Sequence, residues 1–284
     1  MDVVKVNVVQ DGQKLSIEGP GDGKDLGDAS LHVEVPIVYD VNVVTTGSGA
    51  ISCRDMIESH HCHLISEDGD ILVTGVKTQN LVIKSENGDI RCRGAIQGSV
   101  SITSGEGDVV SDKRFLGPSL DVTTDSGDIS VSSCYSDQSK FSTQTGNLDL
   151  RNVHNDSYVA VYEEGQVKMS GLDGTANVFM KKGNLDVQIS HVGSESRIHV
   201  EDGDISLKMA DNHPLKLCVT GTEVVTDEKF AKYGEIETKE DDHKHYSGRI
   251  QPDQFSPLCQ VLADSGKVNI SAQGWAQSLG LKLK

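Results

Sequence analysis

Apolar and polar residues alternate with a period of two along most of the chain, in short runs that recur at a regular distance. Each run after a glycine is apolar in the second and fourth places, as in Gly69, Ile71 and Val73. Another alternating run precedes the next glycine, for example Leu81 and Ile83. A period of two predicts strands with one buried face. Each unit is therefore predicted to hold two strands and a bend, with glycine at the bend to allow a positive φ.

This unit recurs about every 19 residues, which is the signature of a repeat architecture. The repeated glycines are Gly49, Gly69, Gly88, Gly107, Gly127, Gly146, Gly165, Gly183 and Gly203, with a further copy at Gly266 after a longer interruption. Strands inside such a period stack on their equivalents one repeat away. We expect an all-β fold, a single-domain parallel β-helix (β-solenoid) of about 9–11 coils with right-handed winding.

The pattern divides the single expected domain, residues 1–284, into four parts. We expect an N-terminal cap and first strands in 1–46, regular repeats in 47–212, irregular coils with an acidic loop in 213–263, and the last coil with a C-terminal cap in 264–284. Capped ends are expected because open strand edges invite aggregation. The capping segments would be a hairpin turning at Asp11-Gly12 and, at the other end, Trp275 with the alternation from Leu279 to Leu283.

Two segments carry a resemblance to a known family. The segment Leu31-His32-Val33-Glu34-Val35-Pro36 leads through Val41-Asn42-Val43-Val44-Thr45-Thr46-Gly47-Ser48-Gly49 into recurrent Ser/Thr-x-x-Gly-Asp-Ile. In this the chain resembles the adhesin-type β-solenoid family, including its uncharacterised animal members, over nearly its whole length. The resemblance implies stacked coils and no established catalytic activity. The chain departs from the family pattern at Lys267 and between residues 211 and 260.

Charge narrows the class of partner. The chain has 43 Asp and Glu against 26 Lys and Arg, a net charge of -17. Such a surface repels nucleic-acid phosphates and anionic lipid headgroups, so we expect no nucleic-acid partner, whereas basic ligands or cations are favoured. No apolar run approaches the ~20 residues of a membrane-spanning helix, so no membrane insertion is expected. The pattern leaves the protein partner and the oligomeric state open.

Cysteine usage and the N-terminal residues bear on location. The six cysteines lack the C-x-x-C spacing of zinc ribbons and the density of disulfide scaffolds, which favours reduced intracellular thiols. The chain starts almost inside a strand pattern, at Val4, without a secretory signal. We expect the cytoplasm, or the mitochondrion if an upstream targeting segment is missing from this chain.

The acidic residues beside the repeated glycines are the first candidate site. Asp70, Asp89, Asp108 and Asp128 follow four successive glycines. Stacked one coil apart, their carboxylates would suit a hard cation such as calcium. The alternative is local hydrogen bonding in a turn, which Asp and Asn support equally. We favour the turn, because the next coils replace Asp by Asn or Gln.

Histidines and cysteines form the second candidate. His61 and His63 share the outward face of one predicted strand, where two histidines would bind a borderline metal. Cys62 between them falls on the inward face, which predicts a core residue. The same register places Cys53, Cys92 and Cys259 inward, where cysteines act as small hydrophobic residues. Without a third ligand nearby, solvent-exposed histidines are the simpler interpretation.

The expected function depends on the segment that breaks the repeat and on whether the sequence contains catalytic motifs. Residues 226–257 break the period with a cluster of acids and histidines, and such an insertion is either a binding segment or a disordered loop. No nucleophile motif, phosphate-binding loop or dinucleotide motif occurs. We expect a non-catalytic interaction or structural module that needs no cofactor. The alternative is a carbohydrate-active or metal-dependent enzyme on a β-helix scaffold.

Overall fold

The computed structural model describes residues 7–11, 14–18, 32–34, 39–55, 57–239, 242–252 and 256–272. Contacts divide the chain into two compact units, residues 1–36 and 37–284. In the first unit, β1 (Asn7–Asp11) and β2 (Lys14–Glu18) pair antiparallel, which confirms the predicted hairpin. Its predicted role as a cap stays a prediction. The second unit contains the repeats.

Each repeat contributes to two parallel sheets that face each other across the core. Sheet 1 precedes the repeated glycine and sheet 2 follows it. The strands of sheet 1 alone are β3 (Val41–Thr45), β5 (Ile57–Ser66), β11 (His154–Glu164), β14 (Ser196–Asp202), β16 (Leu215–Gly221) and β20 (Leu258–Ala263). Those of sheet 2 alone are β4 (Ile51–Arg54), β10 (Leu148–Arg151), β13 (Leu185–Val192), β15 (Ile205–Met209), β17 (Glu223–Thr226) and β21 (Lys267–Ala272). Five long strands bend from sheet 2 into sheet 1: β6 (Ile71–Ser85), β7 (Ile90–Glu106), β8 (Val109–Ser126), β9 (Ile129–Thr145) and β12 (Val167–Lys182).

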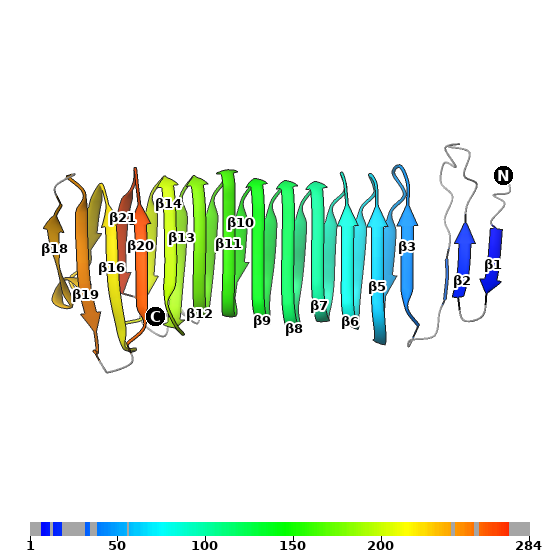
Figure 1. Ribbon diagram of the computed structural model, residues 1–284, viewed down its shortest axis with the longest axis horizontal. Coiled ribbons are helices and arrows are strands. Elements are labelled where there is room, and N and C mark those ends of the chain that lie inside the picture. Colours follow the sequence, from blue (N-terminus) through cyan, green and yellow to red (C-terminus); the bar gives the residue numbers. More distant parts are fainter. Residues whose placement is uncertain are drawn as a thin grey trace, which may run out of the picture. The chain divides into compact units, whose positions relative to one another are not determined.

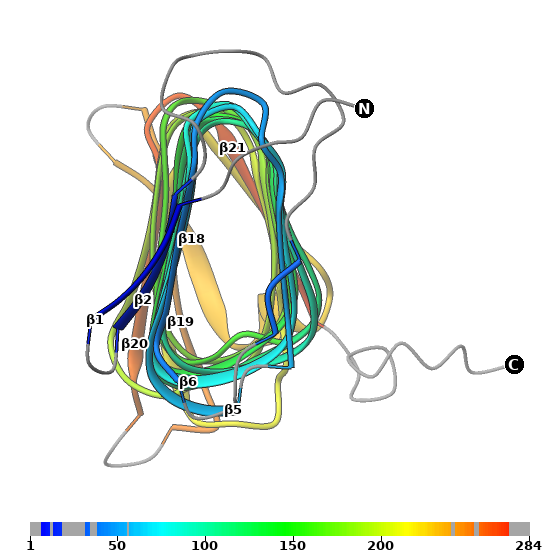
Figure 2. The same ribbon diagram turned by 90° about the vertical axis from the view of Figure 1, so that its right-hand side faces the viewer.

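Equivalent residues of successive repeats lie side by side. Ile71 pairs with Ile90, and Ile90 pairs with Val109, so the register shift between neighbours is one whole repeat. The result is an all-β parallel solenoid of about 9 turns, within the predicted range. Figure 1 shows the successive coils in a row, and Figure 2 shows the flattened cross-section with its two long sides. The direction of winding stays a prediction.

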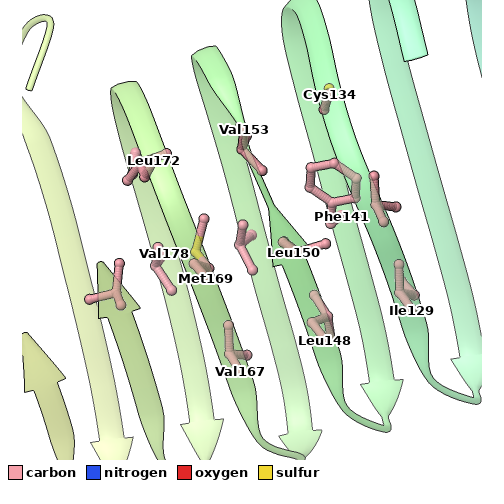
Figure 3. Close-up of a cluster of buried hydrophobic side chains, with 14 of the residues drawn as sticks. Ile129, Cys134, Phe141, Leu148, Leu150, Val153, Val167, Met169, Leu172 and Val178 are labelled. Atoms are coloured by element: carbon pink, nitrogen blue, oxygen red, sulfur yellow. The ribbon is translucent and has the colours of Figure 1, made fainter. Parts of the chain in front are cut away.

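The core is a stack of inward-facing aliphatic side chains. Ile129, Leu148 and Val167 occupy one register position in three coils, and each is at most 2% exposed. Figure 3 shows these side chains pointing into the space between the two sheets. Full burial of one such side chain stabilises the fold by roughly 1.5–3 kcal/mol. The alternating sequence pattern therefore converts directly into a continuous core.

The structure gives a reason for the repeated glycines that the sequence pattern did not indicate. At Gly146, Gly183 and Gly203 φ is 152°, 127° and 151°, which confirms the predicted positive φ. At Gly69 and Gly88 φ does not lie in this region, so the prediction was wrong there. A Cβ on Gly88 would instead collide with the carbonyl of Gly69 in the preceding coil. Consecutive coils approach so closely at this corner that no side chain fits between them.

A second bend, six residues after the first glycine, does use the left-handed conformation. There φ is 61° at Gly75 and 72° at Gly94, and the equivalent Asp55 and Asn152 have 54° and 47°. Glycine, aspartate and asparagine are the residues that tolerate this conformation best. This bend turns the chain from sheet 2 back towards sheet 1.

The last coil in the sequence is not the last coil in space. β14 pairs with β20, and β20 in turn pairs with β16. In sheet 2, β21 likewise lies between β15 and β17. Figure 1 shows β20 and β21, in orange and red, between β14 and β16. The order of the coils in space therefore differs from their order in the sequence: the coil of β20 and β21 lies between the coil of β14 and β15 and that of β16 and β17, which both precede it in the chain.

The terminal coil ends in an antiparallel cap. β16 pairs antiparallel with β19 (Lys244–Ile250), and β19 pairs antiparallel with β18 (Gly234–Thr238). A short 3-10 helix, η1 (Phe230–Lys232), precedes them. Phe230 and Tyr246 are fully buried, and the Tyr246 hydroxyl donates a hydrogen bond of 2.9 Å to the Phe230 carbonyl.

The contacts of the cap decide one of the two alternatives for residues 226–257, the disordered loop. The predicted capping residues at the C-terminus cannot be compared in the same way. Over its described residues this segment is not a disordered loop, because its aromatic side chains cover the end of the core. Trp275 and the stretch from Leu279 to Leu283 lie outside the described residues, as does most of the segment before β3.

Candidate functional site

The residues after the corner glycines from Gly69 to Gly266 form a hydrogen-bonded ladder that crosses the coils. Oδ1 of Asp70 accepts a hydrogen bond of 3.0 Å from the backbone N–H of Asp89, and Oδ1 of Asp89 accepts one of 2.9 Å from that of Asp108. The same contact repeats at every following step to Lys267. We call this the corner ladder; its acceptors are Asp70, Asp89, Asp108, Asp128, Asn147, Gln166, Asn184 and Asp204.

The ladder explains why Asn and Gln replace Asp without breaking the series. The backbone N–H at this corner needs an acceptor, and either a carboxylate or an amide oxygen can provide one. At the Asp128 step the distance is 2.7 Å, and at the Gln166 step it is 3.1 Å. The sequence interpretation as turn chemistry was right about hydrogen bonding but wrong about its range. The bonds join neighbouring coils rather than residues within one turn.

Four consecutive carboxylates at one register position repel each other, and a cation offsets part of this repulsion. Nη1 of Arg91 lies 3.4 Å from Asp70, and Nη2 lies 2.7 Å from Asp89. Arg91 thus bridges two steps of the ladder. At Asp108 and Asp128 the hydrogen bonds from the next coil are 2.8 and 2.7 Å long. Hydrogen bonds to an ionised acceptor are stronger than neutral ones, which compensates for the stacking of like charges.

The predicted metal ligands do not gather into a site within the described part of the chain. No group of three or more His, Cys, Asp or Glu side chains there has the geometry to hold a metal ion. The rings of His61 and His63 approach edge to face with centroids 6.1 Å apart on the outer side of sheet 1. The nearby Asp40 carboxylate accepts backbone hydrogen bonds from His61 and, with a smaller effect, from His60, which lowers the pKa of that carboxyl.

The cysteines face the core to different extents. Cys62, Cys92 and Cys259 are buried, as predicted, and burial raises the pKa of the Cys92 and Cys259 thiols to about 12. Cys53 is half-buried rather than fully buried, because its coil lies near the end of the stack. A hydrogen bond with Cys62 lowers the pKa of the Cys53 thiol. Cys53 is also the more solvent-accessible member of that pair.

A shallow groove follows the ladder on the outer side of sheet 2. It has a volume of about 550 Å³ and extends over the coils from Asp128 to Asp204. Charges of both signs line it, including Asp149, Lys168 and Asp186. Nζ of Lys208 lies 2.8 Å from Asp186, so part of this charge is paired. The groove is net acidic, because four aspartates (Asp128, Asp149, Asp186 and Asp204) line it against one lysine, Lys168.

The sequence missed a row of polar rings at the opposite corner. The ring of Tyr135 stacks on His154 at 4.3 Å between centroids, and Nδ1 of His154 lies 3.5 Å from Asp173. His191 contacts the other oxygen of Asp173 at 3.4 Å, and its ring lies edge-on to His213 at 5.1 Å. These residues come from successive coils. Aligning the repeats beyond the glycine motif would have brought the first three together, since they are 19 residues apart.

Comparisons with known proteins bear on the family. The family model described as Toastrack DUF4097 matches the chain over residues 4–134 and 118–271. No solved structure matches the chain. The family match agrees with the stacked-coil architecture, while the adhesin designation and an animal origin gain no support from it. Among the residues that the structure describes, no helix is long and apolar enough to cross a membrane.

Proposed function

Because the chain belongs to the Toastrack DUF4097 family, we propose that it is a non-catalytic interaction or structural module built on a rigid β-solenoid. The observation that carries the proposal is the corner ladder. Its carboxylates are the most conspicuous candidates for acid–base or metal chemistry, and each accepts a hydrogen bond from the backbone of the next coil. A general acid or base must instead be free to exchange its proton with a substrate.

The shape of the solenoid supports an interaction role. Its outer faces are long, regular strands whose side chains project at fixed spacings, and repeat proteins commonly use such extended surfaces for binding. We also propose an intracellular location, cytoplasmic or mitochondrial, because the six cysteines are free thiols rather than disulfides. Fractionation of the cells that make the protein checks the location.

A substrate screen separates this proposal from its alternative, an enzyme acting on carbohydrates or depending on a metal. The purified chain is incubated with glycan and ester substrates, with and without divalent metals. We expect no saturable turnover. Turnover that is lost when one acidic side chain is replaced by its amide would contradict the proposal, and the same replacement at a distant exposed acid serves as the control.

A further inference from the structure

Five outward side chains of sheet 1 form an exposed apolar and aromatic cluster over β11, β12, β14 and β20. We call it the aromatic row; it comprises Tyr158, Tyr162, Phe179, His199 and Leu262. The ring centroids of Tyr162 and Phe179 are 6.3 Å apart, and those of Phe179 and His199 are 5.8 Å apart. The hydroxyl oxygens of Tyr158 and Tyr162 lie 3.5 Å apart. The rings therefore contact each other across three neighbouring strands.

The three coils before the cluster are polar at the equivalent outward position. In the coils before it, the register position of Phe179 holds Thr103, Thr123 and Ser142. Tyr162 is 37% exposed and lies at a register shift in β11. Exposed aromatic side chains leave apolar area in water, and they are enriched where proteins bind partners.

An acidic hollow borders the row on one side. It has a volume of about 780 Å³, and its lining includes Glu163, Glu164, Lys181, Lys182, Glu201, Asp202 and Asp264. Five carboxylates against two ammonium groups leave a net charge of -3 (two minus five). Nζ of Lys182 lies 3.2 Å from Glu164, so one lysine is already paired with a carboxylate of the hollow.

The row and the hollow are adjacent because of strand geometry. Phe179 and Lys181 are two residues apart on β12, as are His199 and Glu201 on β14, and Asp264, two residues after Leu262, directly follows the end of β20. Residues two apart share a face and lie about 6.6 Å from each other along the strand. A hydrogen bond of 2.9 Å from His199 to Asp264 joins the two features directly. One ligand of peptide size would contact both.

Resting on the proposed function, we propose that this surface binds a basic segment of a partner protein, with arginine or lysine heads in the acidic hollow and apolar side chains on the aromatic row. Guanidinium groups pair with carboxylates and stack on aromatic rings, so arginine satisfies both halves. A second copy of this chain fits poorly, because its own net charge is -17.

Binding of a defined peptide to the full chain tests the proposal. The probe is a fluorescein-labelled, amidated 12-residue peptide of alternating arginine and leucine, followed by fluorescence anisotropy. We expect Tyr162→Ala and the pair Glu201→Gln with Asp202→Asn each to weaken the Kd about tenfold, a larger loss than truncation of most interface residues causes. Matched controls at the opposite corner, Tyr135→Ala and Asp137→Asn with Asp156→Asn, should change it less than about twofold.

Other outcomes would overturn the proposal. These are equal weakening by the control variants, no binding of the arginine–leucine peptide, or full displacement of it by spermine at equal charge concentration. A glutamate–leucine peptide that binds as tightly would do the same. The variants keep their folded state if their melting temperatures match that of the unchanged chain.

Photocrosslinking in the cells that make the protein distinguishes this binding surface from the broader proposal of an interaction or structural module. Benzoylphenylalanine replaces Tyr162 in one variant and Val110 in another; both positions are 37% exposed. We expect Tyr162 to crosslink to a partner segment that mass spectrometry maps as basic. Crosslinks at Val110 alone, or from Tyr162 to an acidic segment or a second copy, would overturn this surface while leaving an interaction role intact. No partner crosslinks at either position would count against both proposals.

Discussion

At the scale of single residues, one side-chain oxygen after each corner glycine from Gly69 to Gly203 joins a coil to the next. This requirement is for an acceptor and not for a charge, so Asp, Asn and Gln alternate freely along the ladder. The corner is acidic because most of its acceptors are Asp rather than Asn or Gln, and the ionised carboxylates accept the stronger hydrogen bonds. The same oxygen also explains why the carboxylates are arranged as regularly as ligands of a cation.

Asp108 separates the two contributions, charge and acceptor. Asp108→Asn keeps Oδ1 for the backbone N–H of Asp128, so the free energy of unfolding should change by less than about 0.5 kcal/mol. Asp108→Ala leaves that N–H without its side-chain acceptor and should lower it by about 1 kcal/mol. Urea denaturation of both variants measures the difference. Equal losses for the two variants would show that charge, not the acceptor, matters.

Calcium should leave the melting temperature nearly unchanged, because the ladder carboxylates already hold backbone N–H groups. A ligand stabilises a fold only by binding it preferentially, and one site at a hundred times its Kd would add about 2.7 kcal/mol. Calorimetry with millimolar calcium, and with sodium chloride at equal ionic strength, measures the shift. A calcium-specific rise that disappears in Asp70→Asn with Asp89→Asn would instead establish a cation ladder.

Gly88 tests the close approach of coils. Gly88→Ala places a Cβ against the carbonyl of Gly69, and overpacking of this kind costs typically 1–3 kcal/mol. Gly193 is the matched control, because a Cβ there meets atoms at 3.4 Å or more, which is ordinary contact. Thermal melts should therefore show a clear loss for Gly88→Ala and little change for Gly193→Ala. A loss of the same size in both would contradict the packing explanation.

At the scale of elements, the sequence predicted the strands but not how the stack ends. Alternation identified both strands of each repeat and the inward face of residues such as Ile71, Ile90 and Cys62. It could not identify the cap, because Phe230 and Tyr246 follow no repeat period. The aromatic row was missed for a related reason: its side chains come together only when coils stack. Period-two patterning gives the face of a residue and not its neighbours across strands.

The cap should loosen at alkaline pH through Tyr246. Burial, with Asp227 and Tyr233 nearby, raises the pKa of Tyr246 to about 12, from about 10 in an unfolded chain. A raised pKa contributes stability that is complete below pH ~10 and is lost as the pH rises through ~12. Tyr246→Phe removes this pH dependence. Because it also removes the hydrogen bond to the Phe230 carbonyl, it should lower the free energy of unfolding by about 1 kcal/mol at neutral pH.

Melting temperatures between pH 9 and 12 test this prediction against Tyr135→Phe, which changes an exposed tyrosine. The unchanged chain and Tyr135→Phe should lose stability more steeply than Tyr246→Phe. Parallel curves for all three proteins would show that Tyr246 does not control the alkaline loss.

At the scale of the whole molecule, the coils form one continuous stack whose spatial order differs from the chain order. The ladder shows this most clearly, since Asp204 holds the backbone N–H of Lys267, 63 residues further along the chain. The sequence contains the glycine at 266 that permits this contact, but a repeat motif does not state which coil it stacks on. Sequential stacking is the usual arrangement, and the long excursion between the two coils overrides it here.

The central claim, that the coil of β20 and β21 is inserted in the stack, is tested most directly by disulfide pairing. Asn269 lies beside Ser206 on one side and Val225 on the other. In a background with Cys53→Ser and Cys218→Ser, Ser206→Cys with Asn269→Cys should form a disulfide rapidly under mild oxidation. Ser206→Cys with Val225→Cys should stay reduced, because two strand spacings, about 9.6 Å, exceed the reach of a disulfide. Mass spectrometry of the oxidised proteins gives the result; rapid bonding of the second pair, with the first remaining reduced, would contradict the inserted coil.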